Sequence, residues 1–500
     1  MGKEDGELED VVPFGLVVLV VALAALAAVL SNRISARLLI PAPVIFLVCA
    51  AVASDAFPAL GQLSTTVVQR VVTVALAVVL FDGGMHIGWS RFRSAAVPIL
   101  WIGVAGTFVT AGGLALGAHE LFGLDWITAL VLGTALSPTD PAVVFSVLGR
   151  REVTGRTGVI LEGESGANDP VGIALMVSLL ASSSAAGAID AGEMIGNFAL
   201  QMAVGAALGI VGGRLLLAFM RRVQLPNEGL YALRTLAGAL ALYGIATVVH
   251  GSGFLAVFIA GIVLGDEAAP YKGDIKRFHA SLSSIAEIVV FVLLGLTVDL
   301  RTLADGNALA IGLGLAVLLT VVIRPVFCGV VLMPVKLTVG ERIFVLWSGL
   351  KGAVPILLGT FVFSSGIPGT TRIYDIIVVV VAFSVLVQGG LVPWVASRCR
   401  VPMRTIEPTP WGLGLRFREP PQGLHRYLVA AGAEADGKAI GDLGLGEDIW
   451  ISFVLRQGRP LQVRSSTVLT AGDEVLVQVD PEEPASDRQK LFTEPRPKSG

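Results

Sequence analysis

The chain is 500 residues long, 54% hydrophobic and only 15% charged, with a mean hydropathy of +0.78. Apolar stretches of about 20 residues, long enough to cross a bilayer, recur along its first four-fifths. The sequence therefore predicts an all-α polytopic membrane protein embedded in a lipid bilayer. A net charge of −3 gives no indication of a nucleic-acid partner, and three scattered cysteines exclude a disulfide framework or a Cys-based metal site. No cofactor is expected.

Thirteen membrane-spanning segments are predicted, and the distribution of basic residues orients them. The segments cover residues 11–31, 37–54, 66–86, 94–117, 126–148, 157–181, 194–220, 230–250, 252–265, 279–299, 307–332, 342–363 and 373–397. Alternate loops are rich in Lys and Arg, whereas the opposite set holds only Lys3, Arg301 and Arg372. The positive-inside rule then places the N-terminus outside and the C-terminal part in the cytoplasm, in a cell (inner) membrane.

The spans divide into six, one and six, so an odd seventh helix inverts the second six relative to the first. Spans five and twelve take corresponding places, and each carries prolines and a charge: Ser137-Pro-Thr-Asp-Pro141 and Gly349-Leu-Lys-Gly-Ala-Val-Pro355. Because proline disrupts the preceding turn, we expect both spans to break into half-helices at the midplane. Asp140 would neutralise facing helix N-termini and Lys351 facing C-termini. An ordinary proline kink is the alternative.

Span six places five polar side chains on one broad helical face: Glu162, Glu164, Ser165, Asn168 and Asp169. A charged group at this depth costs at least ~2.5–3.5 kcal/mol, so it normally faces a partner or a water-filled cavity. Oxygen atoms of such side chains are hard ligands suited to alkali ions, so we predict a cation and proton site here. The alternative is a buried polar seam that only holds helices together.

Arg324, in span eleven, needs a carboxylate partner because an unpaired guanidinium in the membrane is very costly. We predict Glu164 as this partner, with Glu162 as the second choice. Asp82 is interpreted as a helix-end group and Asp299 as an interfacial cap, while Glu287 is equally compatible with a place in the cavity or outside it. None of the histidines is expected to be a metal ligand or proton relay, because all fall at span ends or in the soluble part: His86, His119, His250, His279 and His425.

The amino-acid composition changes near residue 400, where long apolar runs stop. Residues 1–398 are predicted to form the transmembrane domain, followed by a Pro- and Gly-rich linker at 399–426. Short β-like runs then predict a small β-rich cytoplasmic domain at 427–480. Residues 481–500 are polar and rich in Pro, and they are expected to be disordered.

The combination of motifs resembles the NhaP-type monovalent cation:proton antiporters, specifically the potassium/proton antiporter branch of the cell-volume-regulation type. The resemblance covers nearly the whole chain and rests on Thr139-Asp-Pro141, Gly163-Glu-Ser-Gly-Ala-Asn-Asp169, Arg324 and Gly349-Leu-Lys-Gly352. Residues 427–480 resemble a TrkA-C domain, which would allow a small-molecule regulator there. No Gly-x-Gly-x-x-Gly half precedes this segment, so dinucleotide control is not implied.

The resemblance implies a homodimer that exchanges K⁺, or alternatively Na⁺, for H⁺ by alternating access. Asp169 would bind the alkali cation or the proton in competition, with Ser165 and Thr139 assisting, and the Glu164–Arg324 pair would be structural. In this family the Asn-Asp pair found at Asn168 goes with electroneutral exchange. Spans one to three and eight to ten would form a scaffold, and spans four to six and eleven to thirteen a moving core.

Two other classes of protein share single features with this sequence. An ion channel with a cytoplasmic regulatory domain is disfavoured, because no segment resembles a Thr-Val-Gly-Tyr-Gly filter and two inverted halves suit a carrier better. An intramembrane serine protease would use Ser165 in Gly163-Glu-Ser-Gly166, but a nucleophilic serine needs a base and no histidine lies in mid-span. The sequence thus favours a secondary antiporter and not an enzyme.

Overall fold

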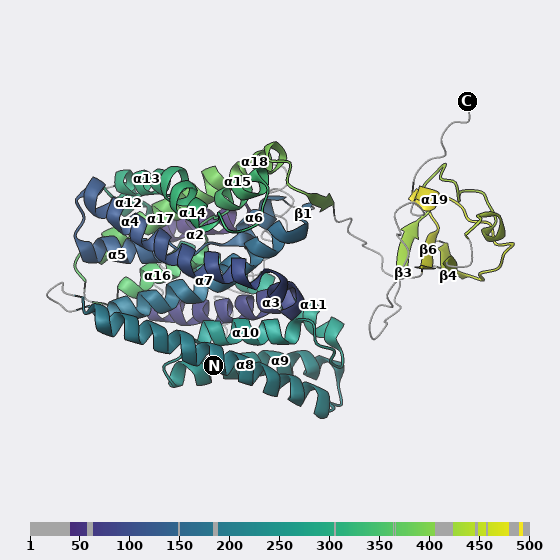
Figure 1. Cartoon of the computed structure of the whole chain (residues 1–500), viewed down its shortest axis with the longest axis horizontal. Helices are drawn as coiled ribbons and strands as arrows, with labels where there is room; N and C mark the ends of the chain where they lie inside the picture. Colours follow the sequence, from purple (N-terminus) through teal and green to yellow (C-terminus); the bar gives the residue numbers. More distant parts are fainter. Residues whose placement is uncertain are drawn as a thin grey trace, which may run out of the picture. The chain divides into compact units, whose positions relative to one another are not determined.

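A computed structural model describes residues 41–57, 64–148, 151–183, 189–304, 307–363, 365, 367–405, 424–445, 449–456, 459–479 and 490–493 (Figure 1). The chain forms two compact units, Met1–Pro410 and Trp411–Gly500. The first predicted span, 11–31, lies outside the described residues. Within the described residues, each of the other twelve predicted spans overlaps helical structure, which confirms the mostly helical membrane fold.

The first half of the membrane unit is built from helices that follow one another closely. Its elements are α2 (Ala42–Ala56), α3 (Thr65–Leu100), η2 (Trp101–Ala105), α4 (Gly106–Phe122), α5 (Trp126–Ala135), α6 (Pro141–Leu148), β1 (Arg151–Val153), α7 (Gly155–Ala181) and α8 (Ala191–Arg222). The loop predicted between spans three and four is instead a break inside α3, where Gly88 takes φ +64°. The amide of Ser90 donates to Asp266 Oδ2 at 2.5 Å just after this break.

The second half continues from α9 to the short strand β2. Its elements are α9 (Glu228–Val248), α10 (Gly253–Gly265), α11 (Lys272–Leu296), α12 (Leu300–Ala304), α13 (Ala308–Leu318), η3 (Leu319–Cys328), α14 (Gly329–Val331), α15 (Val339–Trp347), α16 (Ala353–Val362), α17 (Thr370–Phe383), η4 (Ser384–Gly389), α18 (Val392–Arg398) and β2 (Met403–Thr405). Here η2, η3 and η4 are π-helical segments. No pattern in the sequence indicated these segments, and π-helical turns in proteins are frequent at functional sites.

Local signals in the sequence explain several helix boundaries. Gly123 ends α4 in the left-handed region at φ +65°, and the Asp125 carboxylate then accepts from the Thr128 amide at 3.0 Å to cap α5. Thr338 and Glu341 form a complete capping box at the start of α15. Capping by side chains satisfies the first amides of these helices, so each one starts at a defined residue.

Six helical stretches in the described part of the chain are long and apolar enough to cross a membrane, and four shorter helices are also apolar. The six are Thr65–Phe122, Ala191–Arg222, Glu228–Val248, Lys272–Leu296, Ala308–Val331 and Thr370–Gly389. The shorter ones include α5 and α16, which are the halves of broken spans. A multi-pass membrane protein follows from this set of helices.

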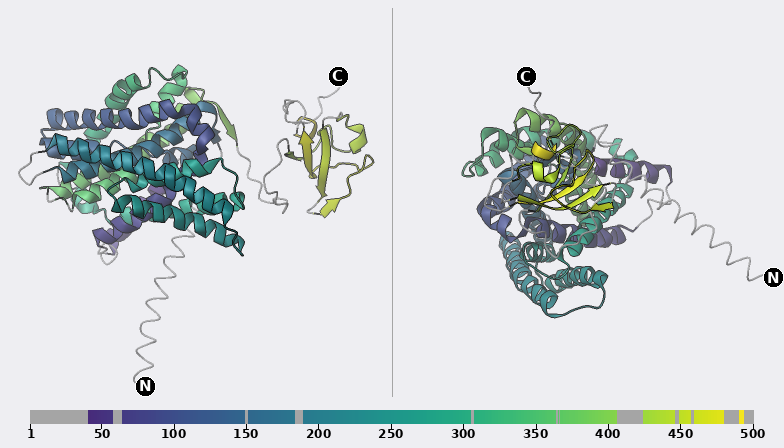
Figure 2. Two further views of the ribbon diagram at one scale, coloured as in Figure 1. Left: turned by 60° about the horizontal axis from the view of Figure 1, so that its bottom comes forward. Right: turned by 90° about the vertical axis from the view of Figure 1, so that its right-hand side faces the viewer.

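The helices of the membrane unit pack in two groups. Helix α10 packs against α3, α8 and α9, whereas α4 packs on α5 and η3, and α13 packs on α17. Figure 1 shows α3 and α7 between α8–α10 and the group of α4, α5 and α13, and Figure 2 shows the bundle from two further sides. At the α3–α10 contact, a Cβ on Gly84 or Gly261 would overlap the facing backbone, so small residues permit this close approach.

A short two-stranded ribbon joins the end of the membrane domain to the start of α7. Strand β2 pairs antiparallel with β1, with Val153 opposite Met403, and Pro402 O accepts from both the amide and the hydroxyl of Thr154. The segment 399–426 was predicted to be a linker, but its residues 403–405 are therefore part of a sheet. Their backbone bonds to the loop between α6 and α7 explain the difference, because local composition does not reveal a partner that is distant in sequence.

The C-terminal unit is a small antiparallel sheet with the strand order β3-β6-β4-β5. Its strands are β3 (Leu424–Leu428), β4 (Ile449–Arg456), β5 (Arg459–Leu461) and β6 (Glu474–Val479), with η5 (Ile440–Asp442) before β4. Residues 490–493, predicted within a disordered tail, form helix α19 (Lys490–Thr493). Phe492 is buried in the core of the domain and its carbonyl accepts from the Ala430 amide, so hydrophobic packing orders this part of the tail.

Candidate functional site

Two membrane spans are broken at their centres, as the proline motifs predicted. Residues 136–140 separate α5 from α6, and residues 348–352 separate α15 from α16. A break leaves carbonyl groups at the end of one half-helix and amides at the start of the next without helical partners. In the membrane these backbone groups need other side chains, and the two breaks supply them to each other.

The side chains of Asp140 and Lys351 cross between the breaks. Lys351 Nζ donates to Ser137 O at 3.0 Å and to Pro138 O at 2.9 Å, beyond the C-terminal end of α5. Asp140 Oδ1 accepts from the Ala142 amide at 2.9 Å at the start of α6, and its Oδ2 lies against Gly352, just before α16. The acid therefore lies at helix N-termini and the base at a helix C-terminus, the arrangement expected from the helix dipoles.

Helix α7 holds the first break from one side. Ser165 Oγ donates to Thr139 O at 2.5 Å, and Asn168 Nδ2 donates to Thr139 Oγ1 at 2.7 Å. The Thr139 amide in turn donates to Asn168 Oδ1 at 3.3 Å. Three of the predicted site residues are thus brought together around one non-helical residue, and Ser165, Asn168 and Thr139 are all buried.

Asp169 lies one residue beyond this cluster on α7. Its side chain is 8% exposed, and Oδ1 has no hydrogen-bond partner among the residues that the structure describes. A buried polar atom in this state needs an explanation, because leaving it unsatisfied costs about 1–3 kcal/mol and more for a charged group. Asp169 thus differs from Asp140, whose carboxylate is bound to backbone at the helix start.

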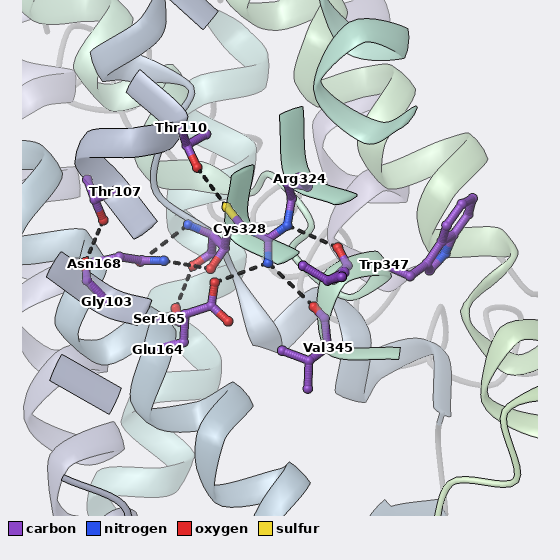
Figure 3. Close-up of polar contacts among 12 residues, drawn as sticks. Gly103, Thr107, Thr110, Glu164, Ser165, Asn168, Arg324, Cys328, Val345 and Trp347 are labelled. Carbon is purple, nitrogen blue, oxygen red and sulfur yellow. Dashed lines mark hydrogen bonds and ion pairs between the residues drawn. The ribbon is translucent and has the colours of Figure 1, made fainter. Parts of the chain in front are cut away.

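The predicted ion pair between Arg324 and Glu164 is present at the centre of the unit (Figure 3). Arg324 Nη2 lies 3.1 Å from Glu164 Oε1, and the two side chains are 3% and 5% exposed. The guanidinium also donates to Leu346 O at 3.0 Å and to Val345 O at 3.4 Å, two of the last three carbonyls of α15. Arg324 therefore links α7 to α15, the first half of the second broken span. The Glu164 carboxylate is engaged by this ion pair.

Glu162, the second choice as partner of Arg324, takes another place. Glu162 Oε2 is 3.4 Å from Arg91 Nη2, in a pair whose side chains are 26% and 44% exposed. The prediction that all five polar side chains share one face is therefore wrong for Glu162, because residues two positions apart on a helix leave it in different directions. Glu162 therefore lies in a wetter environment than Glu164.

The remaining acids lie outside the two breaks. Asp82 is buried in α3 with His86 Nδ1 3.4 Å from its Oδ1, and Glu287 is half-buried in the middle of α11. Asp299 Oδ1 accepts from the Arg301 amide at 2.9 Å and so caps α12. His279, predicted to lie at a span end, is instead fully buried, with Nε2 2.9 Å from Thr235 Oγ1. Helix α11 starts two turns earlier than predicted, which moves His279 inside the bundle.

Sequence reasoning missed a second set of buried polar residues, on η4. Ser384 and Gln388 are 2% and 3% exposed and contact the second break directly. Ser384 Oγ accepts from the Lys351 amide at 2.9 Å, and Gln388 Nε2 donates to Trp347 O at 2.5 Å. A Ser and a Gln four residues apart in span thirteen was the available signal.

Comparison with known families defines the class of the protein. The transmembrane sodium/hydrogen exchanger family matches residues 19–398, and the TrkA-C domain family matches residues 424–485. The chain therefore belongs to the sodium/hydrogen exchanger family and carries a TrkA-C domain after its membrane part. This result confirms the family predicted from the motifs, and with it the class of cation:proton antiporters.

Individual proteins and a solved structure show which members of the family this chain resembles. The K(+)/H(+) antiporter NhaP2 of Shewanella sp. (strain MR-4) is 31% identical over 487 residues, which cover 95% of this chain and 83% of that protein. The protein of the same name from Shewanella oneidensis is 32% identical over 488 residues, with the same coverage. The structure of the sodium proton antiporter MjNhaP1 from Methanocaldococcus jannaschii matches with a TM-score of 0.65 at 19% identity, covering 77% of this chain and 98% of that one.

Proposed function

We propose that this protein exchanges K⁺ for H⁺ across the cell (inner) membrane, with Na⁺ as the alternative cation. The observation that carries the proposal is the buried Asp169 carboxylate, whose Oδ1 has no hydrogen-bond partner within the described part of the chain. Relatives named as K(+)/H(+) antiporters at 31–32% identity over 95% of the chain support K⁺ as the cation.

The chemistry of Asp169 accounts for exchange. One buried carboxylate binds either a proton or an alkali cation, because each neutralises its single charge. Thr139 and Ser165 would contribute further oxygens to the bound cation, and Asn168 holds Thr139 in its non-helical conformation. If the carrier reorients only when Asp169 is neutralised, each cation that moves one way is matched by a proton that moves the other way.

The stoichiometry follows from the number of free carboxylates. Glu164 is occupied by Arg324, and Asp140 is held by the amide that starts α6. Among these three carboxylates, all in the described part of the chain, Asp169 is the one with an oxygen that has no hydrogen-bond partner, so we infer electroneutral 1:1 exchange by alternating access. The groups of helices around α10 and around α5 would be the scaffold and the moving core.

The hydroxyl of Ser165 favours this proposal over an intramembrane serine protease. Its Oγ donates to Thr139 O at 2.5 Å, so the proton points to the backbone and not to a general base. A transporter, rather than an enzyme, is therefore the function that the site supports.

The same proposal extends to assembly and control. We infer a homodimer whose N-terminus lies outside and whose C-terminal domain is cytoplasmic, where a small-molecule regulator would bind within 427–480. Backbone bonds between β2 and the α6–α7 loop support a route for control, because the segment leaving the membrane domain is tied to the helix that carries Asp169. Cross-linking in membranes and ligand-shifted melting of the full chain would test these two points.

The decisive test of the exchange is a comparison of cations in everted membrane vesicles. K⁺, Na⁺, Rb⁺ and Li⁺ are added separately to vesicles with a preformed pH gradient, and dissipation is followed with a fluorescent probe. We expect dissipation by K⁺, against empty-vector vesicles as the control. No response to any of the four cations would contradict the proposed function, and a response to Na⁺ alone would replace K⁺ by Na⁺.

A further inference from the structure

Ser384 and Gln388, both buried on span thirteen, support the second break. Their arrangement resembles that of the residues on span six that support the first break. Thr139 lies two positions before α6, and Lys351 lies two positions before α16. In the first repeat, Ser165 Oγ binds the backbone of Thr139, and in the second, Ser384 Oγ binds the backbone of Lys351. The two serines come from spans six and thirteen, which are counterparts in the inverted repeat.

The correspondence between the two spans extends to the residue that lies four positions after each serine. Asp169 follows Ser165 by four residues, and Gln388 follows Ser384 by four. The place of the carboxylate in the first repeat is therefore taken by a neutral amide in the second. Asp169 Oδ1 has no hydrogen-bond partner among the described residues, whereas both ends of the Gln388 amide are engaged.

Gln388 closes the end of α15 in a chain of hydrogen bonds. Its Nε2 donates to Trp347 O at 2.5 Å, its Oε1 accepts from Ser384 Oγ at 3.0 Å, and its own carbonyl accepts from Trp347 Nε1 at 3.1 Å. Trp347 O directly follows the two carbonyls that Arg324 satisfies. Arg324 and Gln388 together thus satisfy the last carbonyls of this half-helix, which have no helical partners.

Through Ser384 the same chain fixes the residue that reaches the first break. The Lys351 amide donates to Ser384 Oγ, while Lys351 Nζ donates to the carbonyls of Ser137 and Pro138. A shift of the Lys351 backbone would therefore move its ammonium group away from the residues just before Thr139. An electrostatic site tolerates such a shift poorly, since a misplacement of about 1 Å costs up to ~100-fold in rate in enzymes.

We propose that Ser384 and Gln388 are positioning residues for the exchange reaction. They hold Lys351 so that it stabilises the first break beside Asp169, and Gln388 places a neutral amide at the position that corresponds to the Asp169 carboxylate. This inference rests on the proposed exchange function, and it assigns a role to span thirteen.

The test uses Gln388→Glu and Gln388→Met in the full-length protein reconstituted into proteoliposomes. Protonated Glu, like Gln, offers one donor to Trp347 O and one acceptor to Ser384 Oγ; the donor is a hydroxyl in Glu and an amide NH2 in Gln. Ionised Glu has no donor. We therefore expect Gln388→Glu to exchange within about threefold of wild type near pH 6 and to fall about tenfold or more below it near pH 9. Gln388→Met has no polar group and should lose about tenfold or more at both pH values.

Matched controls separate positioning from general damage. Gln201→Glu changes a Gln on α8 that donates to Ser178 Oγ, a hydroxyl that can donate in return, so its pH profile should follow wild type. Ser384→Ala should reduce turnover with little change in the apparent KM for the cation, and Ser384→Thr, which keeps the hydroxyl, should restore it. If Gln388→Met does not fold, the pH profile of Gln388→Glu decides alone.

The proposal is overturned if Gln388→Glu keeps the wild-type ratio of rates at the two pH values. It is also overturned if Gln388→Met exchanges at the wild-type rate. These results leave the proposed function intact, because wild-type exchange is measured in the same experiment. A wild-type protein that exchanges no alkali cation would overturn the proposed function and this inference with it.

Discussion

The two broken spans use the same backbone design and differ in charge. At the first break, α7 offers Ser165, Asn168 and the incompletely bonded carboxylate of Asp169. At the second, η4 offers Ser384 and an amide, Gln388, with both ends bonded. The comparison teaches that α7 and η4 support the two breaks in similar ways, whereas the position of the Asp169 carboxylate on α7 is taken by the neutral amide of Gln388 on η4. A site with one such carboxylate is suited to one-for-one exchange.

The strongest test of this asymmetry removes the charge from the first half. Asp169→Asn keeps the size of the side chain but binds neither a proton nor a cation, so exchange should fall to the background of empty liposomes. Cation-driven proton flux in proteoliposomes measures it, with melting temperature and yield as checks on folding. Cation-driven flux at the wild-type rate in Asp169→Asn would rule out this carboxylate as the carrier.

A second test removes the base that links the two halves. Arg324→Ala leaves Glu164 buried without its partner, and we expect a loss of roughly 3–5 kcal/mol by analogy with buried pairs in soluble proteins. The matched control is Arg91→Ala, since the pair of Arg91 with Glu162 is partly exposed and is worth about 0–1 kcal/mol. Thermal unfolding in detergent compares the two variants. Equal melting temperatures for Arg324→Ala and wild type would disprove a structural role for the pair.

A third test adds a methyl group at Gly352, where the Asp140 side chain contacts the second break. A methyl group at Gly352 would overlap the Asp140 carboxylate, so Gly352→Ala should displace Asp140 and cost about 1–3 kcal/mol together with most of the exchange. Gly112→Ala is the control, because a Cβ there meets nothing within 4 Å and Ala favours the helix. Both are measured for flux and melting temperature. Equal flux and equal melting temperature for Gly352→Ala and Gly112→Ala would contradict close packing of Asp140 against Gly352.

Arg456 and Asp473 form an acid–arginine pair in the C-terminal domain, outside the membrane part, with Arg456 39% and Asp473 1% exposed, and a smaller effect is expected there than at Glu164–Arg324. Burial alone would raise the pKa of Asp473, but hydrogen bonds from Arg456 and the Thr470 amide bring it below its ordinary value. The stabilisation is therefore present at neutral pH and is lost as the pH falls below about 4. Asp473→Asn should lower the stability of this domain by about 1–2 kcal/mol at neutral pH and remove the acid dependence.

Hydrogen exchange of β6 (Glu474–Val479), corrected for intrinsic rates, reports on this domain within the full chain. Faster exchange in Asp473→Asn at pH 7 and a smaller difference from wild type near pH 3 are the expected pattern. A variant whose protection changes with pH in the same way as wild type would show that Asp473 is not the responsible group.

Charges and prolines made the centre of the site predictable from the sequence. Asp140, Lys351, Arg324 and Glu164 each demand a partner in the membrane, and the choice of partners is small. Ser384 and Gln388 were not predicted, because uncharged polar residues occur in membrane helices without a unique partner. Their role depends on the fold of span twelve against span thirteen, which no local pattern reveals.

The limits of the fold prediction have similar physical causes. The π-helical segment η3, which contains Arg324 and Pro325, has the apolar composition of an ordinary helix. Helix α11 begins among polar residues at Lys272 because its first turns are held by packing and not by hydrophobicity. In the C-terminal unit, Phe492 fills the core of a domain that the tail's composition did not suggest.

The central claim is that one carboxylate, Asp169, carries either one cation or one proton, so that a cycle moves no net charge. The direct measurement is cation/proton exchange in proteoliposomes with the membrane potential clamped at zero or at about −100 mV, where each uncompensated charge would contribute ~2.3 kcal/mol. We predict the same rate at both potentials. A many-fold acceleration by the potential would show that a second charge moves and would contradict the single-carboxylate account.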